Sequence, residues 1–493
     1  MGIGTILQLW DISKFFDCEN LRDALGSVYQ CGVQGNLYKL LYELNKDTKI
    51  SVKLSSGLSD ERSIGENVTQ GSIGGGLISA NNLDRGINDQ FKGSSHEICY
   101  GTLRMQPLCF QDDLARMCTS RDSAQAGNIR VSETLDSKLL DANTDKSVYI
   151  IIGPKSKTKK IRSDIETNPL TLGNTELKEK QSDKYLGDLI HQDGLSKSVY
   201  ATIKAREGRI KAAIFELRSI IEDCRLQTVG GTLSGLEIWE LAIIPAILTN
   251  SETWVEIGKD SIETLDCLQN LMFTCLFNVP KTSPRIMLNW DLGAMKMKNR
   301  IIIRKLTFFN HLNNLSENDL GKEMLQIQLK YNYPGLAREC MTYINELKLP
   351  NITEEKVSQI KWKRLVKLAV RDLNQRELRQ EIQGSKKGKE FSHEEFEIKE
   401  YLKTLNLQDA RTIFKKRSKM MQFVKMNFPN DINYRKELWM CSSCQSAIDT
   451  QSHVIWCSAY SKLRENRTLT SDKDLAKYLQ EVLKIRSDLD ILK

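Results

Sequence analysis

Three acidic residues are the first candidates for chemistry. Asp112 and Asp113 lie side by side between two short apolar runs in residues 107–118, which predicts a hairpin with the acids at its turn. Asp11 ends the apolar run 4–11, which predicts a buried strand. Neighbouring carboxylates repel one another, and Mg²⁺, which prefers carboxylate and phosphate oxygens, relieves that repulsion. Two such ions can activate a hydroxyl and stabilise a leaving pyrophosphate. The alternative is a solvated turn.

A second candidate site lies near the end of the sequence. Cys441, Cys444, His453 and Cys457 form a C-x2-C-x8-H-x3-C pattern. The histidine and the last cysteine can share a helix face, and four such ligands suit the tetrahedral coordination of Zn²⁺. We expect one structural zinc ion here, and the alternative is a small core that contains Cys and His. The other nine cysteines stand singly, which favours reduced thiols in an intracellular protein.

The elements that must position these residues change in kind along the chain. Up to about residue 190, strand-like runs alternate with helical patterns, which indicates an α+β fold with a sheet. We expect strands at 4–11, 48–54 and 148–152, helices at 21–29, 37–44 and 129–139, and a further helix opening from the Gly-rich segment 70–87. Later patterns are helical, at 199–221, 236–247, 262–276, 301–312 and 357–370. The sequence GSKKGK at 384–389 predicts an exposed loop.

Composition and charge exclude several classes of protein. The 493 residues are 40% hydrophobic and 27% charged, with 9 Pro and 29 Gly, which excludes wholesale disorder and collagen-like structure. The most apolar stretch, 236–249, contains two glutamates and is shorter than a membrane span. Residues 1–10 do not resemble a signal peptide, so we expect an intracellular protein, nuclear or cytoplasmic. The net charge of +8 is concentrated, because residues 354–436 hold 21 Lys and Arg against 12 Asp and Glu.

The surroundings of the three acids resemble the polymerase core of non-LTR (LINE-type) retrotransposon reverse transcriptases. Residues 11–17 (DISKFFD) are similar to motif A of that family, and Asp11 stands where the family has its first metal ligand. Residues 110–113 (FQDD) look like motif C, with Asp112 as the second catalytic carboxylate and Asp113 beside it. The resemblance implies two Mg²⁺ ions held by Asp11 and Asp112.

Further residues follow the order of the same family. Gln70 and Gly71, in QGS, resemble motif B, which positions the template and the incoming nucleotide. Lys146, in DKS, resembles the motif D lysine near the nucleotide phosphates, and KYLG at 184–187 resembles motif E, which supports the primer end. Phe16 stands where the family keeps a bulky aromatic under the sugar, so the resemblance implies that it favours deoxynucleotides.

The resemblance covers residues 4–255 and 441–464 and implies an order of domains. We expect a reverse-transcriptase palm with a mixed or antiparallel sheet, a helical thumb, a basic helical connector and a CCHC zinc-knuckle-like module, at 1–192, 193–300, 301–436 and 437–493. The basic face of 199–221 is expected to follow the template–primer backbone through charge, and a solvated helix face is the alternative.

The implied function is RNA-directed DNA polymerase, a nucleotidyltransferase that adds dNTPs to a DNA primer on an RNA template. Target DNA is a further implied partner, and no membrane is involved. The resemblance begins at motif A, so we expect the C-terminal portion of such a protein, without fingers and endonuclease, and its activity stays open. The alternative is a non-catalytic, retroelement-derived protein that binds RNA or DNA. The template, the insertion site and the oligomeric state also stay open.

Overall fold

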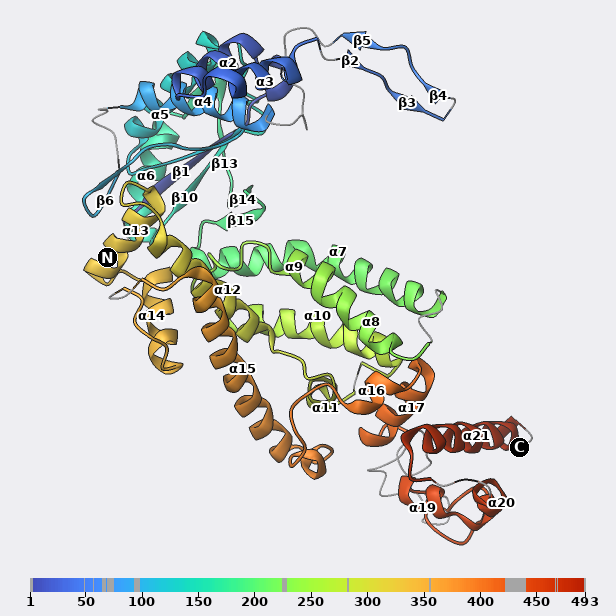
Figure 1. Ribbon diagram of the computed structural model, residues 1–493. Helices are drawn as coiled ribbons and strands as arrows, with labels where there is room; N and C mark the ends of the chain where they lie inside the picture. The colour runs from blue at the N-terminus through green and yellow to red at the C-terminus, as the bar shows by residue number, and fades with distance from the viewer. Residues whose placement is uncertain are drawn as a thin grey trace. The chain divides into compact units, whose positions relative to one another are not determined.

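The chain folds into two compact units in a computed structural model (Figure 1). One unit comprises Met1–Thr202 with Ser316–Pro334, and the other comprises Ile203–Leu315 with Gly335–Lys493. The structure describes residues 3–47, 49–55, 57–63, 68, 75–92, 98–223, 228–281, 283–353, 356–421, 440–465, 467 and 469–491.

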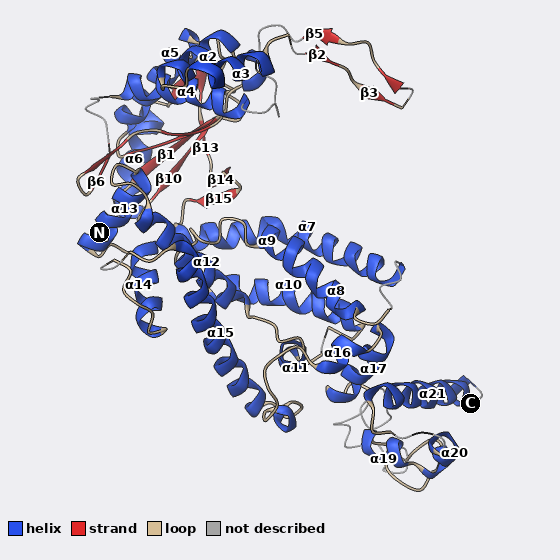
Figure 2. Ribbon diagram, in the orientation of Figure 1, coloured by secondary structure: helices blue, strands red, loops and turns tan. Residues whose placement is uncertain are grey.

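A five-stranded sheet, which includes β1, β10 and β13, forms the centre of the first unit (Figure 2). Its strand order is β13-β10-β1-β9-β8. Its strands are β1 (Thr5–Trp10), β8 (Leu108–Phe110), β9 (Asp113–Cys118), β10 (Val148–Ile152) and β13 (Lys178–Glu179). The central strand β1 runs antiparallel to both neighbours, with Leu9 opposite Val148 of β10 and Ala115 of β9. The pairing of β10 with β13 is parallel, so the sheet is mixed.

Helices and small hairpins surround this sheet. The helices of the unit are α1 (Phe15–Cys18), α2 (Leu21–Gln30), α3 (Gly35–Asn45), α4 (Gly75–Phe91), α5 (Arg121–Ser137), α6 (Lys155–Thr167) and α13 (Leu320–Tyr331). The short strands pair as β2 (Lys49–Ile50) with β5 (Arg62–Ser63), β3 (Lys53–Leu54) with β4 (Gly57–Leu58), β6 (Ile98–Tyr100) with β7 (Leu103–Met105), β11 (Thr171–Leu172) with β12 (Thr175–Glu176), and β14 (Ser182–Tyr185) with β15 (Asp188–His191).

The two faces of the sheet pack against different partners. Successive side chains of a strand point to opposite faces. Ile6 and Trp10 of β1 lie in a core shared with Phe91 of α4 and with residues of α5 and α6. Leu7 and its neighbours on the other face contact Tyr185 in the β14–β15 hairpin. Because both faces are apolar and covered, a one-residue slip of β1 is strongly disfavoured.

Helix α13 joins the first unit although it follows much of the second in sequence. The Tyr100 and Tyr333 rings lie 5.4 Å apart between centroids. A Cβ added to Gly101, which has a φ of +63°, would lie 2.8 Å from Ile327. The hairpin turn of β6 and β7 therefore contacts a segment about 220 residues further along, which local periodicity does not predict.

The second unit is helical. Its helices are α8 (Gly231–Ile238), η1 (Trp239–Ile243), α9 (Ile244–Ile247), α10 (Lys259–Phe277), α11 (Arg285–Asp291), α12 (Met297–Asn314), α14 (Leu336–Glu346), α15 (Gln359–Gly384), η2 (Lys389–Phe391), α16 (Glu400–Thr404), α17 (Leu407–Arg417), α19 (Gln451–Trp456), η4 (Ser458–Tyr460), α20 (Ser461–Arg464) and α21 (Asp472–Ile491). Helix α7 (Leu195–Asp223) contributes residues to both units. Trp239, Trp290 and Trp362 are fully buried in the core of this unit.

The chain thus has a mixed α/β fold with one five-stranded sheet, several two-stranded hairpins and many helices. None of the helices in the described ranges combines the length and the apolar character that crossing a bilayer requires. The eleven cysteines that the structure describes are all free.

Candidate functional site

The three aspartates lie at one end of the central sheet. Trp10, the last residue of β1, is opposite Leu114 of β9. Asp11 directly follows β1 and Asp113 begins β9, so the antiparallel register places them at the same edge. Asp112 precedes Asp113 in the tight turn between β8 and β9. Acids about 100 positions apart in sequence are therefore gathered at one place.

The turn that carries Asp112 has a constrained backbone. Phe110 pairs with Asp113, so Gln111 and Asp112 form a two-residue turn. Gln111 has a φ of 59°, the left-handed region that tight hairpin turns need and that is uncommon for a residue with a side chain. A Cβ on Gly76, near the start of α4, would lie 2.9 Å from Gln111 Nε2. Gly76 therefore allows the close approach of α4 to this turn.

Electrostatic interactions link the acids to one another and to two lysines. Burial, then the charges of Asp112 and Asp11, raise the pKa of Asp113, and Lys184 lowers it. Lys146 Nζ lies 3.7 Å from Asp11 Oδ2, and both side chains reach solvent. The edge therefore concentrates negative charge beside an exposed ammonium group, an arrangement that suits a cation and phosphate oxygens.

The segment 141–147 holds Asp11 and Lys146 together through the backbone. Asn143 N donates to the Asp11 carbonyl at 2.8 Å, and the Asp11 amide donates to Ser147 Oγ at 3.1 Å. Because Lys146 lies inside this hydrogen-bonded turn, its position is set relative to Asp11.

Of the other residues expected at this site, some lie in the described part of the chain and others do not. Phe16, in α1, is half-buried and packs edge-on against Phe15 with ring centroids 5.2 Å apart. Gln70 and Gly71 lie outside the described residues. Tyr185, at the end of β14, packs below the sheet edge, and burial together with Asp113 and Cys109 raises its pKa to about 12.

A buried polar network, which the sequence did not reveal, ties β1 to β9 below the aspartates. Arg116 Nη1 donates to Gln8 Oε1 at 3.2 Å and to the Ser123 carbonyl at 2.8 Å. Gln8 Nε2 in turn donates to Asn128 Oδ1 of α5 at 2.7 Å. Gly127 makes room for this network, because a Cβ there would lie 2.5 Å from Arg116 Nη1. Gln8 and Arg116 each stand three residues from an aspartate of the site.

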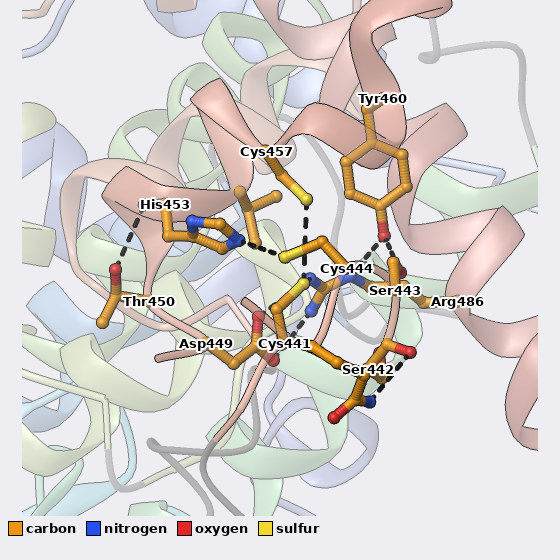
Figure 3. A network of polar contacts seen from close by, with 12 residues as sticks. Cys441, Ser442, Ser443, Cys444, Asp449, Thr450, His453, Cys457, Tyr460 and Arg486 are labelled. Atoms are coloured by element: carbon orange, nitrogen blue, oxygen red, sulfur yellow. Dashed lines mark hydrogen bonds and ion pairs between the residues drawn. The ribbon is translucent and has the colours of Figure 1, made fainter. Parts of the chain in front are cut away.

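The Cys/His pattern near the end of the chain forms a compact cluster (Figure 3). The donor atoms of Cys441, Cys444, His453 and Cys457 all lie within 4.8 Å of one another. Tetrahedral zinc bonds of ordinary length separate two sulfurs by about 3.8 Å and a sulfur from a nitrogen by about 3.5 Å. The observed Cys441 Sγ–Cys457 Sγ and Cys444 Sγ–His453 Nε2 distances are 3.8 and 3.3 Å. The cluster can therefore hold a zinc ion.

In the described part of the chain, this cluster is the one group of three or more such ligands close enough to share an ion. The three aspartates do not form such a cage. Mg²⁺ seldom uses one, since it binds through one or two carboxylates, waters and substrate phosphates. Asp11 and Asp112 therefore fit a site completed by substrate.

Hydrogen bonds to Cys444 favour the thiolate form that binds a metal ion. Although burial raises the pKa of its thiol, hydrogen bonds with the Ser446 hydroxyl and amide, and then with Cys457 and His453, lower it to about 6. Ser446 Oγ lies 3.1 Å from Cys444 Sγ. The ligand form of cysteine is the thiolate, so this environment favours the reactive state.

Helix α21 contributes a buried arginine that the sequence analysis did not single out. Arg486 forms a bidentate ion pair with Asp449 at 2.8 and 2.9 Å and donates to Tyr460 and to Cys441 Sγ, the last at 3.3 Å (Figure 3). A signal was present, because Arg486 occupies the apolar stripe of α21 with Leu479. An arginine on a buried stripe marks a position with an internal partner.

No family model matches this chain, and no curated protein matches its sequence. A solved structure of telomerase from Candida albicans, in complex with a TWJ fragment of telomeric RNA, is similar with 12% identity and a TM-score of 0.29 over 73% of this chain. The chain covers 49% of that protein. A similarity at this TM-score carries no argument about fold or function.

Proposed function

We propose that the chain is an RNA-directed DNA polymerase of the non-LTR retroelement type. The observation that carries the proposal is the gathering of Asp11, Asp112 and Asp113 at one sheet edge with Lys146 beside them. The substrates in this proposal are an RNA template, a DNA primer and dNTPs, with target DNA as a further partner.

The residues of the edge have separate roles in this proposal. Asp11 and Asp112 would hold two Mg²⁺ ions, and these ions would supply activation of a 3′-hydroxyl and charge stabilisation for the leaving pyrophosphate. Asp113 adds negative charge next to them, and Lys146 contacts the phosphates of the nucleotide. Phe16 packs under the sugar and disfavours a 2′-hydroxyl. Gln70 and Gly71 position template and nucleotide.

The remaining chain has supporting roles in the same proposal. We assign residues 1–192 to the palm, 193–300 to the thumb, 301–436 to the connector and 437–493 to a module with one structural zinc ion. The thumb includes α7, and the connector includes α15 with its many basic residues. These parts would hold the template and primer mainly through the phosphate backbone.

A second candidate is a non-catalytic protein that binds RNA or DNA. The four-ligand cluster and the exposed cations of α15 favour it, because neither requires the aspartates. The two candidates agree on nucleic-acid binding and differ only in chemistry.

Primer extension separates them. The full chain is incubated with a labelled DNA primer annealed to an RNA template, the four dNTPs and Mg²⁺. The polymerase proposal expects template-directed extension that EDTA abolishes. Binding of the same template–primer without any extension would support the second candidate and reject the first.

A further inference from the structure

A groove in the helical unit is rich in positive charge. It lies between α12, α15 and the η1–α9 segment and encloses about 770 Å³. Helices α12 and α15 pack side by side (Figure 1). Ile244, Leu248 and Ile303 contribute apolar lining, and the six cations of the lining are Arg300, Arg304, Lys363, Arg364, Lys367 and Arg371.

Two of the six cations form hydrogen bonds or ion pairs with other residues that line the groove. Arg300 forms a bidentate ion pair with Glu240 at 2.5 and 2.6 Å, and Arg304 donates to the Leu248 carbonyl at 3.0 Å. Among the described residues of the lining, Glu240 is the one acid. The groove therefore keeps a surplus of positive charge.

The other four cations belong to one face of α15. Lys363, Arg364, Lys367 and Arg371 are exposed, and within the described ranges no ion pair is formed by any of them. Their spacing of i, i+1, i+4 and i+8 places them along one side of the helix. Long exposed cations held in a row without acids are arranged for an external anion.

Helix α7 also carries several cations, and it differs from α15 in how they are paired. Lys204 and Lys211 pair with Glu207 at 2.8 and 2.6 Å, and Arg218 pairs with Glu222 at 3.3 Å. These cations are neutralised on their own helix, so their charge is less available to a polyanion than that of α15.

We propose that the α15 groove binds the phosphate backbone of a nucleic-acid duplex. The eight residue-to-residue steps from Lys363 to Arg371 advance about 12 Å along the helix, and a duplex strand presents a phosphate about every 3.4 Å along its axis. Four cations thus face roughly three or four phosphates. No aromatic ring is among the described lining residues, so the groove offers charge without base stacking, and binding is independent of base sequence.

The inference rests on the proposed function, which supplies the RNA–DNA hybrid as the duplex. An acidic protein segment has a charge of the same sign, but it does not present the roughly three or four phosphates that a duplex strand places along the span of the four cations.

The test is duplex binding by the full chain at several salt concentrations. The probe is a fluorescein-labelled RNA–DNA hybrid of about 20 base pairs, and fluorescence anisotropy is measured from about 50 to 200 mM KCl. The groove variant carries Lys363→Gln, Arg364→Gln, Lys367→Gln and Arg371→Gln. We expect it to bind at least about tenfold more weakly and to lower the slope of log affinity against log salt by about 3.

A matched control removes the same number of charges from the same connector outside the groove. It carries Lys361→Gln, Arg376→Gln, Lys386→Gln and Lys389→Gln, at exposed positions that do not line the groove. We expect its affinity to change by less than about twofold. Circular dichroism and thermal melting verify that both variants fold.

Two outcomes would overturn the inference. One is an equal loss of duplex affinity in both variants, which would assign binding to diffuse charge. The other is unchanged duplex affinity in the groove variant with lost binding of a fluorescent polyglutamate peptide, which would assign the groove to an acidic protein segment. Failure of the polymerase proposal appears separately, as absent primer extension with normal duplex binding.

Discussion

Arg486 brings a positive charge next to a cluster of thiols. Three thiolates and one Zn²⁺ carry a net charge of −1, so a guanidinium at 3.3 Å from Cys441 Sγ offsets the excess. The same guanidinium holds Asp449, whose side chain is fully buried. Arg486 therefore acts on the metal ligands directly and on the fold through Asp449.

Replacing Arg486 separates these two actions. Arg486→Met leaves a buried carboxylate without its cation, so we expect a loss of about 3–5 kcal/mol in the free energy of unfolding. We also expect a 10- to 100-fold loss of zinc affinity, measured by competition with a chromophoric chelator. In the double variant Arg486→Met/Asp449→Leu, stability should recover and zinc affinity should stay low. Recovery of both would mean that Arg486 affects the cluster only through Asp449.

Glu19 is a second buried ionisable residue, and its burial affects how the stability of the protein depends on pH. Its side chain is 1% exposed, and Asn82 Nδ2 donates to its Oε1 at 2.6 Å. Burial raises its pKa from 4.5 to about 7, although Asn82 and Lys138 lower it. The native state therefore holds this proton more tightly than the unfolded chain does.

The pH dependence of stability follows from that shift. Glu19 contributes its full stabilisation below about pH 4.5, and the contribution disappears as the pH rises to about 7, up to about 3 kcal/mol in total. Glu19→Gln cannot ionise and keeps an acceptor for Asn82, so its free energy of unfolding should fall less between these pH values. Urea denaturation at a series of pH values measures this. The exposed Glu166→Gln serves as control, and equal pH slopes in wild type and Glu19→Gln would contradict the assignment.

At the scale of elements, the sequence patterns predict strands and helices well where one face is buried. The strand expected at 148–152 is β10 with the same bounds, the hairpin in 107–118 is β8 and β9, and the helix expected at 199–221 lies inside α7. Burial explains this success, since a repeating apolar face reports both the element and its orientation.

Three expectations agree with the structure only in part. The strand expected at 48–54 is divided into β2 and β3, whose described residues are exposed. The helix expected at 129–139 ends at Ser137, and Leu139 has a φ of 56° and is 85% exposed. The exposed loop expected at 384–389 follows the end of α15 and exposes Lys386 and Lys389, but Gly388 within it is buried, and a Cβ there would lie 2.6 Å from Ile382. The sequence alone does not show whether an apolar residue lies outside a core or whether a glycine lies inside one.

Sequence motifs identified some residues of the candidate sites, and only the structure revealed others. Family-like motifs named Asp11, Asp112 and Lys146, and the structure places them together, while their roles stay a proposal. The Cys/His spacing predicted a cluster that the structure confirms as able to hold zinc. Partners such as Arg116 and Arg486 depend on tertiary packing, which spacing along the chain does not contain.

Gly127 tests the coupling between helix α5 and the strands that carry the aspartates. Gly127→Ala places a Cβ against Arg116 and Gln8, so we expect a loss of about 1–3 kcal/mol in the free energy of unfolding despite the better helix propensity of Ala. Gly26→Ala in α2 is the control, because nothing lies within 4 Å of its Cβ, and we expect a gain of about 0.5–1 kcal/mol. Thermal and urea unfolding measure both. If Gly127→Ala were as stable as Gly26→Ala, the hydrogen-bond network of Arg116 and Gln8 would accommodate the added methyl group, and the expected clash would be wrong.

At the scale of the whole molecule, the acidic cluster and the cationic row lie in different compact units. The acids of the sheet edge belong to one compact unit, and the cationic row of α15 belongs to the other. A metal-dependent polymerase needs both a negative centre for cations and a positive surface for a nucleic-acid backbone. The net charge of +8 is the balance of 71 Lys and Arg against 63 Asp and Glu over the whole chain, so it does not show this separation.

The most direct test of the account is the rate of single-nucleotide addition with and without Asp112. Wild type, Asp112→Asn and the exposed control Asp122→Asn are compared on one RNA-templated DNA primer with Mg²⁺. Metal-dependent catalysis at Asp112 predicts extension by wild type and by Asp122→Asn, and a loss of at least roughly a thousandfold in Asp112→Asn, because removal of a metal ligand costs several kcal/mol in the transition state. Equal rates in wild type and Asp112→Asn would contradict it.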